Sequence, residues 1–123
     1  MMPREHAKKP EAVRALFDKL MQERMHNFPR VGERWGVPAK AGVYIVYCSK
    51  GEVCYVGQGN LRSRLGSHLR YSEIVSRRFG KGLRKNGSFR FLMVDDERDR
   101  LYLEGLATGC LCPTGVGMRF AVA

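Results

Sequence analysis

The sequence predicts an α/β (α+β) fold in which a three-stranded antiparallel β-sheet is flanked by helices. Two runs of β-branched and aromatic residues, Val43 to Tyr47 and Val53 to Val56, stand on either side of a short polar segment, which is the pattern of a β-hairpin. Helical periodicity precedes and follows this hairpin. A chain of 123 residues is long enough for one hydrophobic core and too short for a second. Residues 1–40 are therefore expected to pack on the domain formed by residues 41–123.

The N-terminal region is expected to contain a tail, a helix and a connection. Residues 1–9 are basic and are predicted to be disordered, and Pro10 suits the first turn of a helix. This extra N-terminal helix carries an apolar stripe of helical period, made of Val13, Leu16, Phe17, Leu20, Met21 and Met25. Residues 27–40 are expected to form an irregular connection. The stripe needs a surface to cover it, and a partner protein or a homodimer is left open as an alternative to the chain's own core.

The turn of the hairpin predicts its register. If the turn centres on residues 50 and 51, the numbers of opposed residues sum to about 101, so Val46 faces Tyr55 and Tyr44 faces Gly57. The two tyrosines then lie diagonally on one face of the sheet, within reach of a shared ligand. Taken alone, two tyrosines in a hairpin are ordinary strand formers.

A helix is predicted directly after the second strand. Asn60 is a favourable N-cap, and leucines at four-residue spacing, Leu61, Leu65 and Leu69, give residues 61–70 an apolar face. Arg64 and His68 share another face of this helix, toward the edge of the sheet. The rest of the chain predicts a short helix within 73–78, a third strand at 89–94 and a closing helix at 97–110.

The charge of the chain is concentrated in its middle. The net charge is +10, and residues 61–90 hold nine basic residues and one acidic residue. A polyanion is the natural partner of such a block, because each phosphate contact also releases counterions. The candidate nucleic-acid-binding residues are Arg62, Arg70, Arg77, Arg78, Lys81, Arg84 and Lys85. The alternative is a basic surface that serves only solubility. It is the less favoured interpretation, because solubility does not require charge of one sign to be concentrated in one segment.

Membrane association and disulfide bonding are not expected. No stretch approaches the roughly 20 apolar residues that span a bilayer, so a cytoplasmic protein is predicted. In the register above, Cys54 and Cys48 point to opposite faces, and a bond between them would distort the hairpin. The four cysteines are therefore expected to be small buried thiols, with a four-cysteine metal site as the alternative.

Three separated groups of residues resemble the motifs of the GIY-YIG nucleases, over roughly residues 41–116. The tripeptides Gly42-Val43-Tyr44 and Tyr55-Val56-Gly57 match the two sequences that give the family its name. Arg64 and His68 match its conserved arginine and the histidine or tyrosine four residues later. Leu103-Glu104, with Pro113 nine residues after the glutamate, matches its closing helix. Two departures are a loop before Arg64 that is one residue shorter and Val116 in place of the usual asparagine.

The resemblance implies a metal-dependent DNA endonuclease that acts in DNA repair or restriction. Its implied catalytic residues are Tyr44, Tyr55, Arg64, His68 and Glu104, with Glu104 as the protein ligand of Mg²⁺ or Mn²⁺. Phosphodiester hydrolysis develops negative charge on oxygen, which an arginine fork and a metal stabilise. Tyr44 is the favoured base, with help either from neutral His68 or from the metal, and Tyr55 is the favoured phosphate or water ligand.

Two other functions compete with the endonuclease. One is a catalytically weak nucleic-acid-binding module that keeps the scaffold and the charge. The other is a subunit of a larger DNA-processing complex, docked through the N-terminal stripe. Retention of Tyr44, Tyr55, Arg64 and Glu104 together favours the enzyme, because a module that only binds has no physical need for all four.

Overall fold

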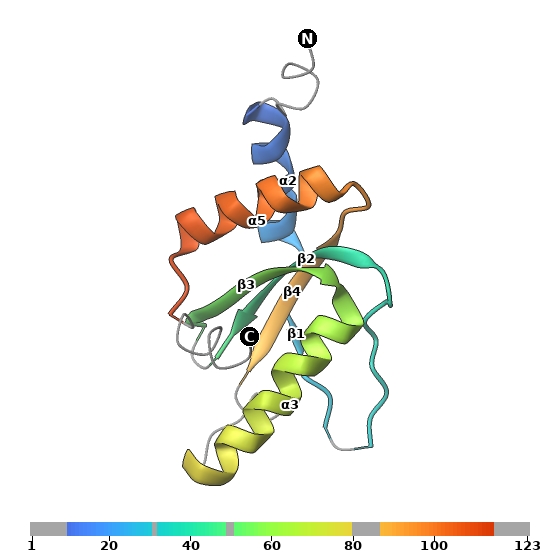
Figure 1. The fold of residues 1–123 in the computed structure, drawn as a ribbon, viewed down its shortest axis with the longest axis vertical. Helices are drawn as coiled ribbons and strands as arrows, with labels where there is room; N and C mark the ends of the chain where they lie inside the picture. Colours follow the sequence, from blue (N-terminus) through green and yellow to red (C-terminus); the bar gives the residue numbers. More distant parts are fainter. Residues whose placement is uncertain (1–9, 31, 49–50, 80–86, 115–123) are drawn as a thin grey trace.

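The computed structural model describes residues 10–30, 32–48, 51–79 and 87–114, with residues 71–79 as backbone only. The fold is α+β, as expected, and its sheet is antiparallel with the order β1-β4-β2-β3. Figure 1 shows α2 and α5 on one side of this sheet and α3 on the other. In chain order the elements are α2 (Pro10–Gln22), β1 (His26–Asn27), β2 (Ala41–Tyr47), β3 (Val53–Asn60), α3 (Leu61–Phe79), β4 (Ser88–Met93) and α5 (Glu97–Leu111).

The described residues form a sheet of four strands, where three were expected. The additional strand, β1, pairs His26 with Phe89 and Asn27 with Ser88 of β4. The His26 ring also stacks on Phe89 and Phe91, with centroids 5.3 and 5.2 Å away. A strand of two residues is too short to show the alternation that identifies a β-strand in a sequence, so it could not be predicted. It forms through contacts with a distant part of the chain.

The central strand β2 divides the hydrophobic core into two halves, which explains its continuous apolar run. On the side of α3 lie the even-numbered Tyr44 and Val46, together with Phe28, Val37, Cys54, Leu61, Leu65, Leu69 and Phe89. On the side of α2 and α5 lie the odd-numbered Val43, Ile45 and Tyr47, together with Leu20, Val56, Val94, Leu103 and Ala107. The two halves lie on opposite faces of the same strand, so β2 fixes the positions of the two helical layers relative to each other.

The predicted hairpin register is confirmed from Ala41 to Val46. Tyr44 pairs with Gly57 and Val46 pairs with Tyr55, as the turn position implied. Beyond Val46 the register shifts by one, so that Tyr47 pairs with Val53. The shift leaves Cys54 as the extra residue of a β-bulge.

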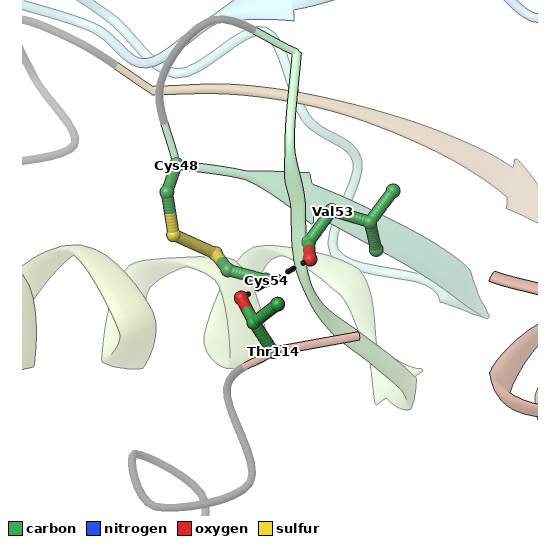
Figure 2. The surroundings of a disulfide bond; sticks show 4 residues. All are labelled: Cys48, Val53, Cys54 and Thr114. Carbon is green, nitrogen blue, oxygen red and sulfur yellow. Dashed lines mark hydrogen bonds between the residues drawn. A yellow bond between two sulfur atoms is a disulfide. The ribbon is translucent and has the colours of Figure 1, made fainter. Parts of the chain in front are cut away.

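The prediction of buried, unbonded thiols is wrong. Cys48 and Cys54 form a disulfide with a Cα–Cα distance of 5.7 Å (Figure 2). The bulge is the physical reason, because it turns Cys54 toward the α3 side, where Cys48 also packs. Cys110 and Cys112 are free and exposed, so they are not the buried thiols that were expected either.

The segment after α5 is attached to the strand beside this disulfide. The backbone N–H of Thr114 donates to the carbonyl oxygen of Val53 at 3.2 Å, and its hydroxyl donates to the same oxygen (Figure 2). Cys112, in the left-handed conformation with φ of 48°, ends α5 and redirects the chain toward β3. The end of α5 is thereby fixed to the edge of the sheet.

Side-chain caps mark the starts of α3 and α5, and the cap of α3 was predicted. The N–H of Ser63 donates to Asn60 Oδ1 at 3.0 Å, which confirms Asn60 as the N-cap of α3. Asp96 caps α5 in the same way by accepting from the N–H of Asp99. Helix α3 continues to Phe79, so the separate short helix expected within 73–78 is its last part.

In the N-terminal region, α2 packs its apolar stripe on the half of the core that α5 also covers, with Val13 and Leu20 buried. Met25, the last residue of the predicted stripe, lies beyond α2 and is 41% exposed. The predicted tail, residues 1–9, lies outside the described residues. Among the helices described, none combines the length and the apolar character that crossing a membrane would require.

Candidate active site at the β3 edge of the sheet

Three aromatic rings, those of Tyr44, Tyr55 and His68, form the centre of the candidate site. Tyr44 and Tyr55 stack in nearly parallel planes with centroids 6.2 Å apart, and His68 packs on both, 4.2 Å from Tyr55 and 5.5 Å from Tyr44. The Tyr44 hydroxyl and His68 Nε2 lie 2.9 Å apart in a buried hydrogen bond. The diagonal placement of the tyrosines that the sequence predicted thus brings both against the same histidine.

Two glycines of β3 make room for this site. A Cβ at Gly57 would overlap the Tyr44 hydroxyl, and a Cβ at Gly59 would lie 3.3 Å from Cγ of Arg64. Gly59 also has φ of 132°, a backbone conformation that L side chains rarely adopt. Glycine at positions 57 and 59 therefore leaves the space that the site needs. The sequence signal for Gly59 was its spacing of two residues from Gly57.

The site draws on both helical layers because β3 is an edge strand. Helix α3 contacts β3 from one side and α5 contacts it from the other (Figure 1). Arg64 and His68 belong to α3, and Glu104 belongs to α5. The charges of Arg64 and Glu104 both reach the Tyr44 hydroxyl. The structure therefore brings together the five residues for which a catalytic role was predicted.

The environment holds Tyr44 in its protonated form. Burial raises the pKa of Tyr44 far above its ordinary value, and electrostatic interactions with Tyr55 and Glu104 raise this pKa further. Arg64 opposes them and lowers the pKa of Tyr44, through its positive charge and a side-chain hydrogen bond. In the protein without substrate, Tyr44 is therefore a phenol at neutral pH.

The environment also holds His68 in its neutral form. Burial, and then the positive charge of Arg64, lower the pKa of His68 to about 4. His68 is 4% exposed, so it lies deeper than a helix face at the sheet edge would suggest. Its Nδ1 is buried without a hydrogen-bond partner among the described residues, whereas Nε2 is used by Tyr44. His68 is thus a neutral group available to exchange a proton with Tyr44.

The sequence did not indicate how α5 is fixed to the site. Arg100 donates from Nε to Gln58 Oε1 at 3.0 Å and from Nη1 to the carbonyl oxygens of Val94 and Asp95. Gln58 stands between the two glycines of β3, and Arg100 lies one helical turn before Glu104. Arg100 thereby links the helix that carries Glu104 to the strand that carries Tyr55.

The predicted nucleic-acid-binding residues are only partly placed. Arg62 and Arg70 are exposed on α3, where Arg70 Nη2 donates to Ser67 Oγ at 3.1 Å. Arg77 and Arg78 belong to the part of α3 described as backbone only. Lys81, Arg84 and Lys85 lie outside the described residues.

Glu104 is the carboxylate of this site that suits a metal ion. Its negative charge acts on Tyr44, and the side chain is half-buried at the edge of the core. No group of three or more His, Cys, Asp or Glu side chains gathers as a metal cage within the described part of the chain. A single carboxylate completed by waters and substrate phosphate is a set that Mg²⁺ accepts. The donor set therefore fits a magnesium ion that is shared with a substrate.

Fold and site together define an α+β domain with a tyrosine pair, an arginine and a glutamate gathered at one sheet edge. The UvrC-like GIY-YIG domain model matches residues 40–108, and the chain belongs to this family within the GIY-YIG nuclease superfamily. This result confirms the family that the sequence motifs indicated.

Curated relatives match a little over half of the chain. The UvrABC system protein C of Koribacter versatilis is 36% identical over 69 residues, which are 55% of this chain and 11% of that protein. The corresponding protein of Methanosphaera stadtmanae is 37% identical over 70 residues, 55% of this chain and 12% of its own length. The chain thus matches about a tenth of the length of these relatives.

Proposed function

We propose that the protein is a metal-dependent DNA endonuclease that hydrolyses phosphodiester bonds. The observation that supports this most directly is the buried hydrogen bond between Tyr44 and His68, on which the charges of Arg64 and Glu104 converge. A phenol with a neutral imidazole can accept a proton from water, a guanidinium can bind phosphate and a carboxylate can hold a metal ion, and phosphodiester hydrolysis can use each of these functions. The relationship to UvrABC system protein C favours DNA as the polymer and repair as its setting.

Arg64 is proposed to bind the phosphate that is attacked. It is exposed at the start of α3, beside Gly59, where a strand of DNA can approach. A guanidinium donates two parallel N–H groups to the oxygens of a phosphate. Its effect is greatest in the transition state, when negative charge on those oxygens increases.

Tyr44 and His68 are proposed to act on the attacking water as a pair. With neutral His68 accepting at Nε2, the Tyr44 O–H points to the histidine and its oxygen lone pairs are available to orient a water. As the water attacks, its proton passes to Tyr44 Oη while the Tyr44 proton passes to His68. A bound phosphate favours this transfer, because its negative charge offsets the positive charge of Arg64 that lowers the pKa of His68.

Tyr55 and Glu104 complete the proposed site. Tyr55 is more exposed than Tyr44 and stacks on it, so its hydroxyl is proposed to bind the phosphate or the water. Glu104 is proposed to hold Mg²⁺ or Mn²⁺, which supplies stabilisation of the charge on the phosphate and leaving oxygen. Arg100 is proposed to position Glu104 through its bond to Gln58.

Nicking of supercoiled plasmid tests this proposal. We expect the purified protein to nick the plasmid with Mg²⁺ or Mn²⁺, and we expect Glu104→Gln to lower the rate by on the order of a thousandfold. The matched control is Glu97→Gln, because Glu97 is an exposed glutamate in the first turn of the same helix. It should nick at the rate of the unchanged protein.

The same experiment separates the enzyme from its rival. Equal nicking by the unchanged protein and by Glu104→Gln would assign the activity to a contaminant. Absence of nicking from both, with binding to DNA retained, would favour the nucleic-acid-binding module. Either result would overturn the proposed function.

A further inference from the structure

A pocket lies on the α3 side of the sheet, outside the Tyr44–His68 site. Its volume is about 420 Å³, and it is lined by Arg34, Trp35 and Arg62. This size falls within the range of small-molecule binding pockets. Two guanidinium groups give it positive charge, and the indole gives it an aromatic wall.

Two of the side chains that line it, those of Arg62 and Trp35, are held by the rest of the fold. Arg62 donates from Nε to the carbonyl oxygen of Val37 at 2.9 Å, which fixes its guanidinium beside the 32–38 segment. Trp35 packs edge-on against Phe28 and tilted against Phe89, with centroids 6.2 and 6.1 Å away. Both contacts limit rotamer freedom, so binding a ligand here costs little additional ordering.

We propose that this pocket binds one unpaired nucleotide of a DNA strand, with the base against Trp35 and the flanking phosphates on Arg34 and Arg62. The proposal rests on the proposed function, because it names the form of DNA that this endonuclease holds. Aromatic side chains stack on bases of any sequence, and arginine binds the phosphates between them. A base inside a duplex is already stacked and paired, so an indole in a pocket selects a base that is out of the helix.

The position of the pocket suits a strand that also enters the candidate active site. Arg62 and Arg64 both lie in the first turn of α3, and a separation of two residues places them about 200° apart around the helix axis. Arg62 faces the Trp35 pocket, and Arg64 lies against Gly59 of the catalytic edge. A strand that crosses the N-terminal end of α3 therefore passes from one arginine to the other.

Trp35 is the single tryptophan of the chain, so its fluorescence reports on this pocket directly. The experiment titrates the Glu104→Gln protein, in EDTA so that no DNA is cut, with a ten-nucleotide oligothymidylate, a fully paired duplex and thymidine monophosphate. We expect the single strand to quench Trp35 fluorescence, and the duplex to bind with little quenching. Thymidine monophosphate should quench only at concentrations at least about a hundredfold higher, because it carries one phosphate and no neighbouring nucleotides.

Variants identify the groups responsible, with binding followed by anisotropy of a labelled oligothymidylate. Trp35→Leu, which keeps an apolar side chain on Phe28 and Phe89, should weaken single-strand binding about tenfold, and Trp35→Phe should restore most of the loss. Arg34→Gln should flatten the dependence of log affinity on log salt by about 0.7, the value for one phosphate contact with a single strand. The matched control is Arg98→Gln, an exposed arginine of α5, which should leave the slope unchanged.

Three results would overturn the pocket assignment. They are saturated single-strand binding without quenching, equal quenching by duplex and single strand, and equal affinity of the Leu and Phe variants. Quenching by the monophosphate at the concentration of the oligonucleotide would assign the pocket to free nucleotides instead. None of these results depends on nicking, so this inference and the proposed endonuclease can fail separately.

Discussion

Among the residues of the site, His68 combines burial, contacts with both tyrosine rings and a shifted pKa. It is buried, its ring contacts both tyrosines, and its pKa is lowered to about 4 by burial and then by Arg64. A histidine that is neutral in the folded protein but ionises normally when unfolded makes stability depend on pH. The functional role proposed for His68 therefore has a consequence that can be measured without substrate.

We expect the free energy of unfolding to be unaffected by His68 above pH 6.5, where the imidazole is neutral in both states. As the pH falls from 6.5 to about 4, the unfolded chain binds a proton that folded His68 does not, so stability is lost. The full loss is about 3 kcal/mol, from about 1.4 kcal/mol for each pKa unit. Urea unfolding at a series of pH values measures it.

His68→Gln is the comparison for this measurement, because glutamine can keep a hydrogen bond to Tyr44 and does not titrate. The difference in stability between the two proteins should change between pH 6.5 and 4, whereas acidic groups common to both cancel. A constant difference across this range would show that the pKa of His68 is not lowered.

At the scale of the element, β3 decides whether the site can form. It is an edge strand, and its Gly57 lies against the Tyr44 hydroxyl. Tyr44 is fully buried, so its ring cannot shift toward solvent to make room for a larger side chain. We expect Gly57→Ala to destabilise the protein by about 1–3 kcal/mol through overpacking. We also expect it to lower nicking by on the order of a hundredfold, by displacing the Tyr44 hydroxyl from His68.

Gly105→Ala is the matched control, since it adds the same methyl group on α5 and the new Cβ has no neighbour within 4 Å. A glycine inside a helix is less favourable than alanine, so this variant should be stabilised by about 0.5–1 kcal/mol. Thermal unfolding and plasmid nicking of both variants give the answer. Tolerance of Gly57→Ala in both assays would contradict the packing described.

The hairpin itself is predicted to depend on its disulfide. Cys48 and Cys54 are separated by 6 residues, and closing so short a loop stabilises the folded state by about 2 kcal/mol in the chain-entropy model. Reduction with dithiothreitol should lower the free energy of unfolding by this amount. The double variant Cys48→Ala/Cys54→Ala should be insensitive to dithiothreitol, and equal unfolding curves of the unchanged protein with and without reductant would refute the prediction.

At the scale of the whole molecule, DNA binding and catalysis are expected to depend on different residues. Residues 61–90 hold nine of the 22 basic residues, and Arg64 is the one among them for which a catalytic role is proposed. Neutralising Arg77, Arg78, Lys81, Arg84 and Lys85 should weaken binding to duplex DNA and flatten the salt dependence of log affinity by about 0.9 for each phosphate that the variant no longer binds. Turnover of saturated enzyme should be unaffected.

Arg64→Ala is the complementary variant, and it should lower turnover at saturation far more than affinity. Binding titrations over a range of salt concentrations and single-turnover nicking separate the two effects. An unchanged salt slope in the cluster variant, together with loss of binding but normal saturated turnover in Arg64→Ala, would show that the assignment of roles is reversed.

Much of this protein is determined by its sequence alone. The hairpin register up to Val46 follows from the turn position, and the start of α3 follows from Asn60, because both depend on residues close together in the chain. The five residues for which a catalytic role was predicted were selected through the resemblance of three sequence motifs to those of the GIY-YIG nucleases. Their roles stay predictions until the variants above are measured.

Only the tertiary structure decided the remaining features. The bulge turned Cys54 toward Cys48, and the two residues of β1 paired with β4. Trp35 came to line the same pocket as Arg62 of α3. Burial and the nearby charge of Arg64 set the pKa of His68. Each of these features depends on packing between distant segments, and the periodicity of a single segment carries no information about such contacts.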